Sequence, residues 1–105
     1  MKVIFAPEVE EDLFGLVEIL VRNGYLGTYD FAISYVEDLV YFIQTNIQKK
    51  IKIKAPAYFD KFGSGLWYIT YRRNTNTTWY IFFTQIEDTY WVKYITNNHV
   101  AAQYL

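Results

Sequence analysis

The stretch LWYITYRRNTNTTWYIFFTQIEDTYWVKYITN, residues 66–97, decides how this chain folds. It contains three runs rich in β-branched and aromatic residues, at residues 66–73, 77–85 and 89–97. The segments between them, NTNT and IEDT, are short enough for hairpin turns. We therefore expect three consecutive antiparallel strands.

Side-chain alternation along the first of these strands gives the sheet two different faces. Trp67, Ile69 and Tyr71 form one set of side chains, and Tyr68, Thr70 and Arg72 form the other. We expect the first set to rest on helices and the second to face solvent or a partner.

The N-terminal half of the chain predicts one strand followed by two helices. Residues 2–6 have the composition of a strand, and Pro7 suits the first position of a helix that ends at Asn23-Gly24. Thr28 is a suitable N-cap for a second helix over residues 29–48, where apolar residues recur every three or four positions. The two helices should form a hairpin.

The order β-α-α-β-β-β predicts an α+β fold, with the helical hairpin on one face of a largely antiparallel sheet. At 105 residues, the chain is expected to form a single domain over residues 1–105. It has no cysteine and only one histidine, which argues against thiolate or imidazole-rich metal sites. We find no leader-like segment and no apolar run of the ~18–20 residues that a membrane span requires. A cytoplasmic protein without membrane contact, metal or cofactor is the expectation.

The net charge of −1 hides an uneven distribution. Residues 1–48 contain two bases and eight acids, whereas residues 49–105 contain eight bases and three acids. Such asymmetry indicates a polyanion bound to the basic half, and the alternative is solvated helix faces in one half with a few lysines in the other. The segment QKKIKIKAPAYFDKFGSG, residues 48–65, is expected to form a surface loop. Its lysines Lys50, Lys52 and Lys54 either follow a phosphate backbone or guard an edge strand against pairing.

Several side chains have the chemistry that RNA cleavage requires. Attack by a 2′-hydroxyl needs a proton acceptor, a proton donor and cations for the charge on phosphorus. Arg72 and Arg73 offer guanidinium groups, and His99 has the intrinsic acidity for proton transfer near neutrality. Tyr104 or Tyr68 could stack on a base. The alternative interpretation is a histidine that is solvated where the sheet ends, with tyrosines that pack within it.

The chain as a whole resembles the RelE/ParE superfamily of type II toxin–antitoxin toxins. The resemblance rests on a first strand leading into APEVEEDL, a helix pair, a basic linker, WYITYRRN, TTWYIFFTQ and a terminal His-x-x-x-x-Tyr. It implies the same α+β fold and a cognate antitoxin whose extended tail wraps the toxin. RelE-like members cleave mRNA on the ribosome, whereas ParE-like members inhibit DNA gyrase without nuclease residues.

The resemblance also implies roles for individual residues. Lys50, Lys52 and Lys54 match linker bases that touch RNA, and Arg72 matches the arginine that faces the scissile phosphate. His99 and Tyr104 match the histidine and tyrosine of the family's C-terminal tail, so Arg72, His99 and Tyr104 are the candidate catalytic residues and Arg73 an additional RNA-binding base.

Three features of this chain depart from the family's nuclease pattern. Val100 stands where the family often has arginine, Asn98 stands where some of its nucleases keep a catalytic arginine, and the pI is only about 5.7. The leading hypothesis is a ribosome-dependent mRNA endonuclease of a bacterial toxin–antitoxin system that inhibits translation and arrests growth. The low pI and the missing tail arginine favour the alternative of a non-catalytic gyrase inhibitor, and a degenerate antitoxin-binding module without activity is the third hypothesis. A higher-order complex with the antitoxin is also compatible with the sequence.

Overall fold

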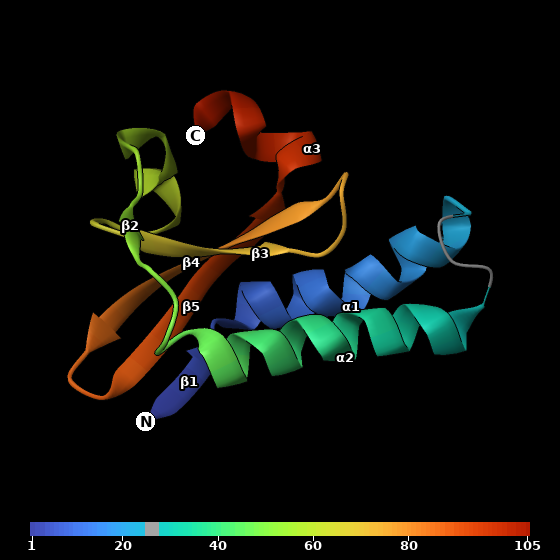
Figure 1. Ribbon diagram of the computed structural model, residues 1–105, viewed down its shortest axis with the longest axis horizontal. Helices are drawn as coiled ribbons and strands as arrows, with labels where there is room; N and C mark the ends of the chain where they lie inside the picture. The colour runs from blue at the N-terminus through green and yellow to red at the C-terminus, as the bar shows by residue number, and fades with distance from the viewer. Residues whose placement is uncertain (25–27) are drawn as a thin grey trace.

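In the computed structural model, which describes residues 1–24 and 28–105, two long helices pack on one face of a five-stranded sheet (Figure 1). The elements are β1 (Lys2–Phe5), α1 (Pro7–Arg22), α2 (Tyr29–Asn46), β2 (Ile53–Lys54), the 3₁₀ helix η1 (Ala57–Phe62), β3 (Trp67–Arg72), β4 (Thr78–Ile86), β5 (Thr89–Asn97), α3 (Asn98–Ala101) and the 3₁₀ helix η2 (Ala102–Tyr104). This confirms the predicted α+β class. The middle of the predicted loop between the helices, residues 25–27, lies outside the described residues.

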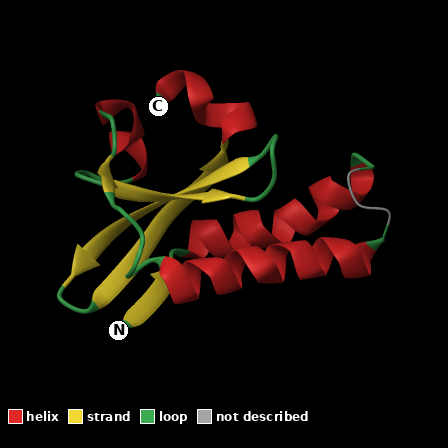
Figure 2. Cartoon of the chain, viewed as in Figure 1, coloured by secondary structure: helices red, strands yellow, loops and turns green. Residues whose placement is uncertain are grey.

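The sheet has the strand order β1-β5-β4-β3-β2, and only β1 pairs in parallel, with β5 (Figure 2). The prediction of a plain loop over residues 48–65 was wrong, because this segment contains β2 and η1. β2 pairs with the start of β3 at the edge of the sheet, so the edge-strand alternative applies to Ile53 and Lys54. Two paired residues before Pro56 are too few to produce a periodic signal in the sequence.

The helix boundaries follow local capping chemistry. The Thr28 hydroxyl accepts a hydrogen bond from Phe31 N at 3.3 Å, which confirms the predicted N-cap of α2. α1 ends at Arg22, and Gly24 follows with a positive φ of 73°, a conformation that favours glycine. No helix within residues 1–24 and 28–105 is long and apolar enough to cross a membrane.

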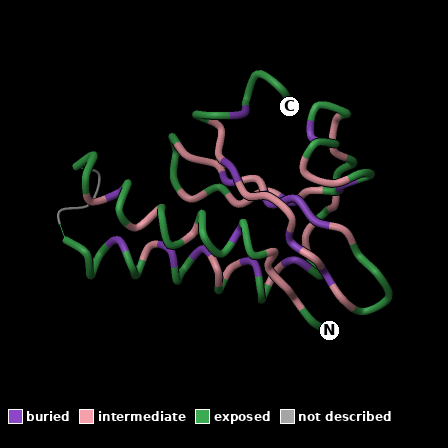
Figure 3. Tube along the Cα trace, turned by 180° about the vertical axis from the view of Figure 1, so that it is seen from behind, coloured by how far each residue is buried: buried purple, intermediate pink, exposed green. Residues whose placement is uncertain are grey.

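The sheet separates two apolar clusters, and buried residues follow its strands (Figure 3). The larger cluster lies between the sheet and the two helices, where Tyr71 stacks on Phe42 of α2 with ring centroids 3.8 Å apart. Ile69 is buried in the same cluster, so the predicted packing against the helices is confirmed for Ile69 and Tyr71, whereas Trp67 at the start of β3 is 40% exposed. The smaller cluster lies on the opposite face and is covered by η1, whose Phe59 stacks on Phe82 at 4.4 Å. We call this second side the far face.

A bulge in β5 decides which side chains reach the far face. Phe82 pairs with Tyr94 and Phe83 pairs with Val92, so Lys93 is an extra residue without a partner in β4. Val92 therefore packs in the cluster beneath the helices, whereas Tyr94, two residues later, packs on the far face. Without the extra residue, alternation would direct both side chains to the same face.

Candidate nucleic-acid interface

Arg72 lies at the end of β3, with its side chain exposed on the far face. Its Nε donates a hydrogen bond to Asn74 O at 3.4 Å, within the β3–β4 turn. No described carboxylate lies within ion-pair distance of Arg72, because the ion pairs among the described residues join Met1 to Asp88 and Arg73 to Asp38. The guanidinium is therefore available to an anionic ligand.

His99 lies beside the same turn because its neighbour Asn98 is hydrogen-bonded to that turn. Asn98 accepts a hydrogen bond from Thr78 N at 2.9 Å and donates one to Asn76 O at 3.1 Å. His99 Nε2 lies 3.2 Å from Thr77 Oγ1, a hydrogen-bond distance, and the imidazole is exposed. Since Thr78 is the cross-strand partner of Arg72, these contacts bring Arg72 and His99 to the same end of the sheet.

Tyr104 lies on the far face as well, but it contacts η1 instead of the β3–β4 turn. Its ring stacks on Tyr58 with centroids 3.6 Å apart, and the Lys61 ammonium lies 3.9 Å from the Tyr58 ring centroid. Hydrogen bonding by Lys61, together with its charge, lowers the pKa of Tyr58, whereas hydrogen bonding to Tyr58 raises the pKa of Tyr104. The C-terminal segment thus runs from the β3–β4 turn, which His99 contacts, to η1 (Figure 1).

Tyr68 was expected to face solvent or a partner, but it packs among other aromatic side chains on the far face. It is half-buried, 5.2 Å from the Phe82 ring and 5.9 Å from the Tyr80 ring. Burial raises its pKa. Because η1 covers this part of the sheet, Tyr68 contributes to the floor of the interface and Arg72 to its exposed rim.

The linker lysines lie on the other side of the sheet from Arg72. Each ammonium lies over an aromatic ring: Lys50 over Phe42 at 5.9 Å, Lys52 over Tyr90 at 5.7 Å and Lys54 over Trp67 at 5.2 Å. Phe42 and Tyr90 belong to the cluster beneath the helices. Trp67 lies five residues before Arg72 in β3, so the side chains of these two residues point to opposite faces of the sheet. The lysines therefore form a basic edge of their own, apart from Arg72 and His99.

Arg73 is also separated from Arg72, because its guanidinium packs on α2. It lies 3.9 Å from the Tyr35 ring centroid, donates to Tyr35 O at 3.1 Å and pairs with Asp38 at 3.4 Å. Its side chain is only 16% exposed. Of the predicted site residues, the structure brings Arg72 and His99 to one end of the far face, with Tyr104 on η1, and directs the other four elsewhere.

The helical hairpin carries a groove that was not among the sites expected from the sequence. The groove has a volume of about 660 Å³, is lined mainly by apolar side chains of α1 and α2, and carries Glu10, Glu18 and Glu37 among its lining residues. Phe14 contributes to it and is 78% exposed. Apolar residues outside the predicted buried stripes, Phe14 and Ile33 among them, are the signal from which the groove could have been inferred.

Among residues 1–24 and 28–105, no group of three or more acidic or histidine side chains is arranged to hold a metal ion. The chain matched no family model, no curated protein and no solved structure.

Proposed function

We propose that this chain is the toxin of a type II toxin–antitoxin system and cleaves mRNA on the ribosome as RelE-like toxins do. The supporting observation is the proximity of an exposed, unpaired Arg72 to His99 at the β3–β4 turn. In this proposal Arg72 stabilises charge on the scissile phosphate. His99 exchanges a proton with the reacting oxygens, with Thr77 orienting the ring. Tyr104 positions a nearby base.

The proposal is tested by mRNA cleavage in a purified translation system. We expect Arg72→Ala to lower the cleavage rate by about 100-fold or more, and His99→Ala by a similar amount, because each removes a group acting in the transition state. Arg22→Ala, at the exposed end of α1, is the matched control and should cleave normally. Equal cleavage by wild type and Arg72→Ala would reject the role assigned to Arg72.

The groove on the helical hairpin supports the proposed antitoxin partner. Its apolar lining and glutamates suit an amphipathic helix with basic residues at its margins. Co-expression with the adjacent reading frame should recover a stable complex. Failure to recover one would count heavily against the toxin–antitoxin proposal.

A ParE-like gyrase inhibitor is the second candidate. The observation that favours it is the division of basic residues, since Lys50, Lys52 and Lys54 lie across the sheet from Arg72 and offer no single track for one phosphate backbone. A supercoiling assay separates the two candidates: inhibition of gyrase together with intact mRNA would replace the endonuclease. Normal growth on induced expression without a partner would instead indicate a binding module without activity.

A further inference from the structure

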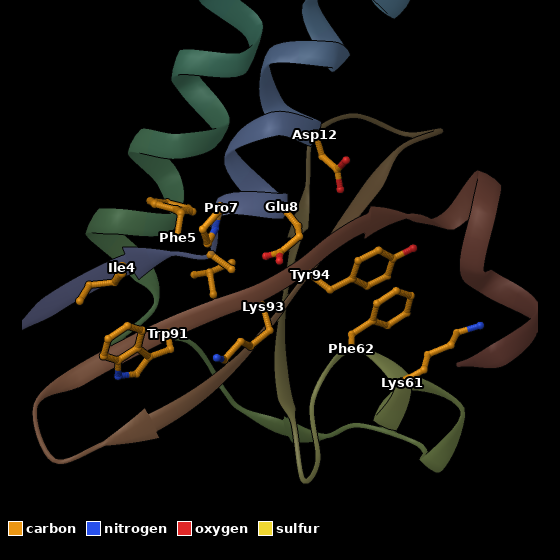
Figure 4. A pocket seen from close by; sticks show the side chains of 12 residues that line it. Ile4, Phe5, Pro7, Glu8, Asp12, Lys61, Phe62, Trp91, Lys93 and Tyr94 are labelled. Atoms are coloured by element: carbon orange, nitrogen blue, oxygen red, sulfur yellow. The ribbon is translucent and has the colours of Figure 1, made fainter.

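A second cavity opens beside β1, the strand at one edge of the sheet (Figure 4). It has a volume of about 670 Å³ and lies between β1, the first turns of α1, the end of η1 and β5. The β5 bulge contributes to it directly, because Lys93 lines the cavity with Trp91 and Tyr94 on either side of it in sequence.

Charges of both signs line this cavity without neutralising one another. Glu8 and Asp12 come from α1 and are four residues apart, so they share one side of the helix. Lys93 and Lys61 come from β5 and η1. No ion pair within 4 Å joins any of these four residues to a described partner, since the two ion pairs present lie elsewhere.

The two lysines contact aromatic rings instead of the carboxylates. Lys93 Nζ lies 5.8 Å from the Trp91 ring, and Lys61 extends away from the cavity toward Tyr58 (Figure 4). Phe62 and Tyr94 stack with centroids 3.7 Å apart and form a second aromatic wall. The cavity therefore offers two carboxylates that form no ion pair with its lysines, one cation from Lys93, and planar apolar surfaces.

We infer that this cavity binds a nucleotide whose base carries an exocyclic amino group, with guanine the best fit. Carboxylates only accept hydrogen bonds, and the Watson–Crick edge of guanine presents two adjacent N–H donors to such a group. Glu8 and Asp12 supply the acceptors, the stacked Phe62 and Tyr94 supply apolar surface for the ring, and Lys93 supplies a cation for the phosphate. Uracil has no exocyclic amine and should bind poorly.

This inference rests on the proposed cleavage of RNA, and the cavity would be the site at which the protein recognises a base of that RNA. Lys61 connects the two regions, because its side chain lines the cavity while its ammonium lies over Tyr58, the stacking partner of Tyr104. A strand that runs from Arg72 past Tyr104 and Lys61 would thus reach the cavity, where the identity of a base is read.

The test is a titration of the whole protein with GMP and with UMP, which carry the same charge, followed through the indole N–H signal of Trp91 by NMR. Trp91→Phe assigns that signal among the three tryptophans. We expect a saturable shift with GMP and little shift with UMP. The double variant Glu8→Gln/Asp12→Asn should bind GMP roughly tenfold more weakly, because it removes charge-assisted acceptors.

Two controls separate base recognition from nonspecific attraction to positive charge. Lys93→Met should weaken GMP binding but leave guanosine binding unchanged, since guanosine lacks the phosphate. Glu18→Gln, on the same helix but in the hairpin groove, should bind GMP like wild type. Equal shifts with GMP and UMP, or unchanged GMP binding in the Glu8→Gln/Asp12→Asn variant, would overturn the inference. GMP binding without mRNA cleavage would reject only the endonuclease, and cleavage without GMP binding would reject only this site.

Discussion

Arg72 and Arg73 are neighbours in sequence, but strand alternation directs their side chains to opposite faces of the sheet. The Arg72 side chain ends in solvent, whereas that of Arg73 covers Tyr35 and donates to its carbonyl oxygen. The same guanidinium chemistry is therefore exposed to solvent at one position, where we propose ligand binding, and packs helix against sheet at the next.

This difference predicts that replacing Arg73 lowers the stability of the fold, whereas replacing Arg72 lowers activity and leaves stability nearly unchanged. Arg73→Ala should lower the free energy of unfolding by about 2 kcal/mol, because it removes a stacked guanidinium and a charge-assisted hydrogen bond to a backbone carbonyl. Arg72→Ala should change stability by less than about 0.5 kcal/mol, as expected for an exposed side chain. Urea denaturation measures both, and Arg73→Lys should recover only part of the loss because an ammonium lacks the planar stacking surface. Equal stability of the two alanine variants would contradict the packing role.

At the scale of elements, η1 and the C-terminal segment are joined by a three-layer stack of Lys61, Tyr58 and Tyr104. Because Lys61 lowers the pKa of Tyr58, ionisation of that phenol favours the folded state. The stabilising contribution develops as pH rises from the lowered pKa toward the usual value of about 10. The raised pKa of Tyr104 has the opposite sign and opposes folding above that value.

The stack can be tested by NMR titration of tyrosine-labelled protein, with Tyr58→Phe and Tyr104→Phe to assign the two signals. We expect Tyr58 to ionise at lower pH than Tyr104. Lys61→Met should raise the Tyr58 pKa, because it removes the hydrogen-bonding cation. Coincident titration of the two phenols in wild type would show that the stack does not persist in solution.

At the scale of the whole molecule, features governed by local rules were predictable and features governed by distant contacts were not. The hairpins of β3, β4 and β5 follow from alternation and short turns, and β5 has the predicted bounds. β2 exists only because β3 offers it an edge, and the β5 bulge depends on packing against both clusters. Arg72 was therefore assigned to the correct face, whereas the separation of the linker lysines from it depends on the path of a segment with no periodic signal.

The separation of the linker lysines from Arg72 leads to a prediction that distinguishes electrostatic binding of RNA from RNA cleavage. The triple variant Lys50→Met/Lys52→Met/Lys54→Met should reduce the slope of log K for RNA binding against log salt concentration by about 2, because each phosphate contact to a single strand contributes about 0.7. Cleavage at saturating ribosome concentration should be unchanged, since these lysines lie across the sheet from Arg72. Arg72→Ala should change the slope by only about 0.7 and yet lower the cleavage rate by about 100-fold or more. A triple variant that binds with an unchanged slope but fails to cleave would show that the lysines act at the scissile phosphate. That result would reject the proposal that cleavage takes place on the far face.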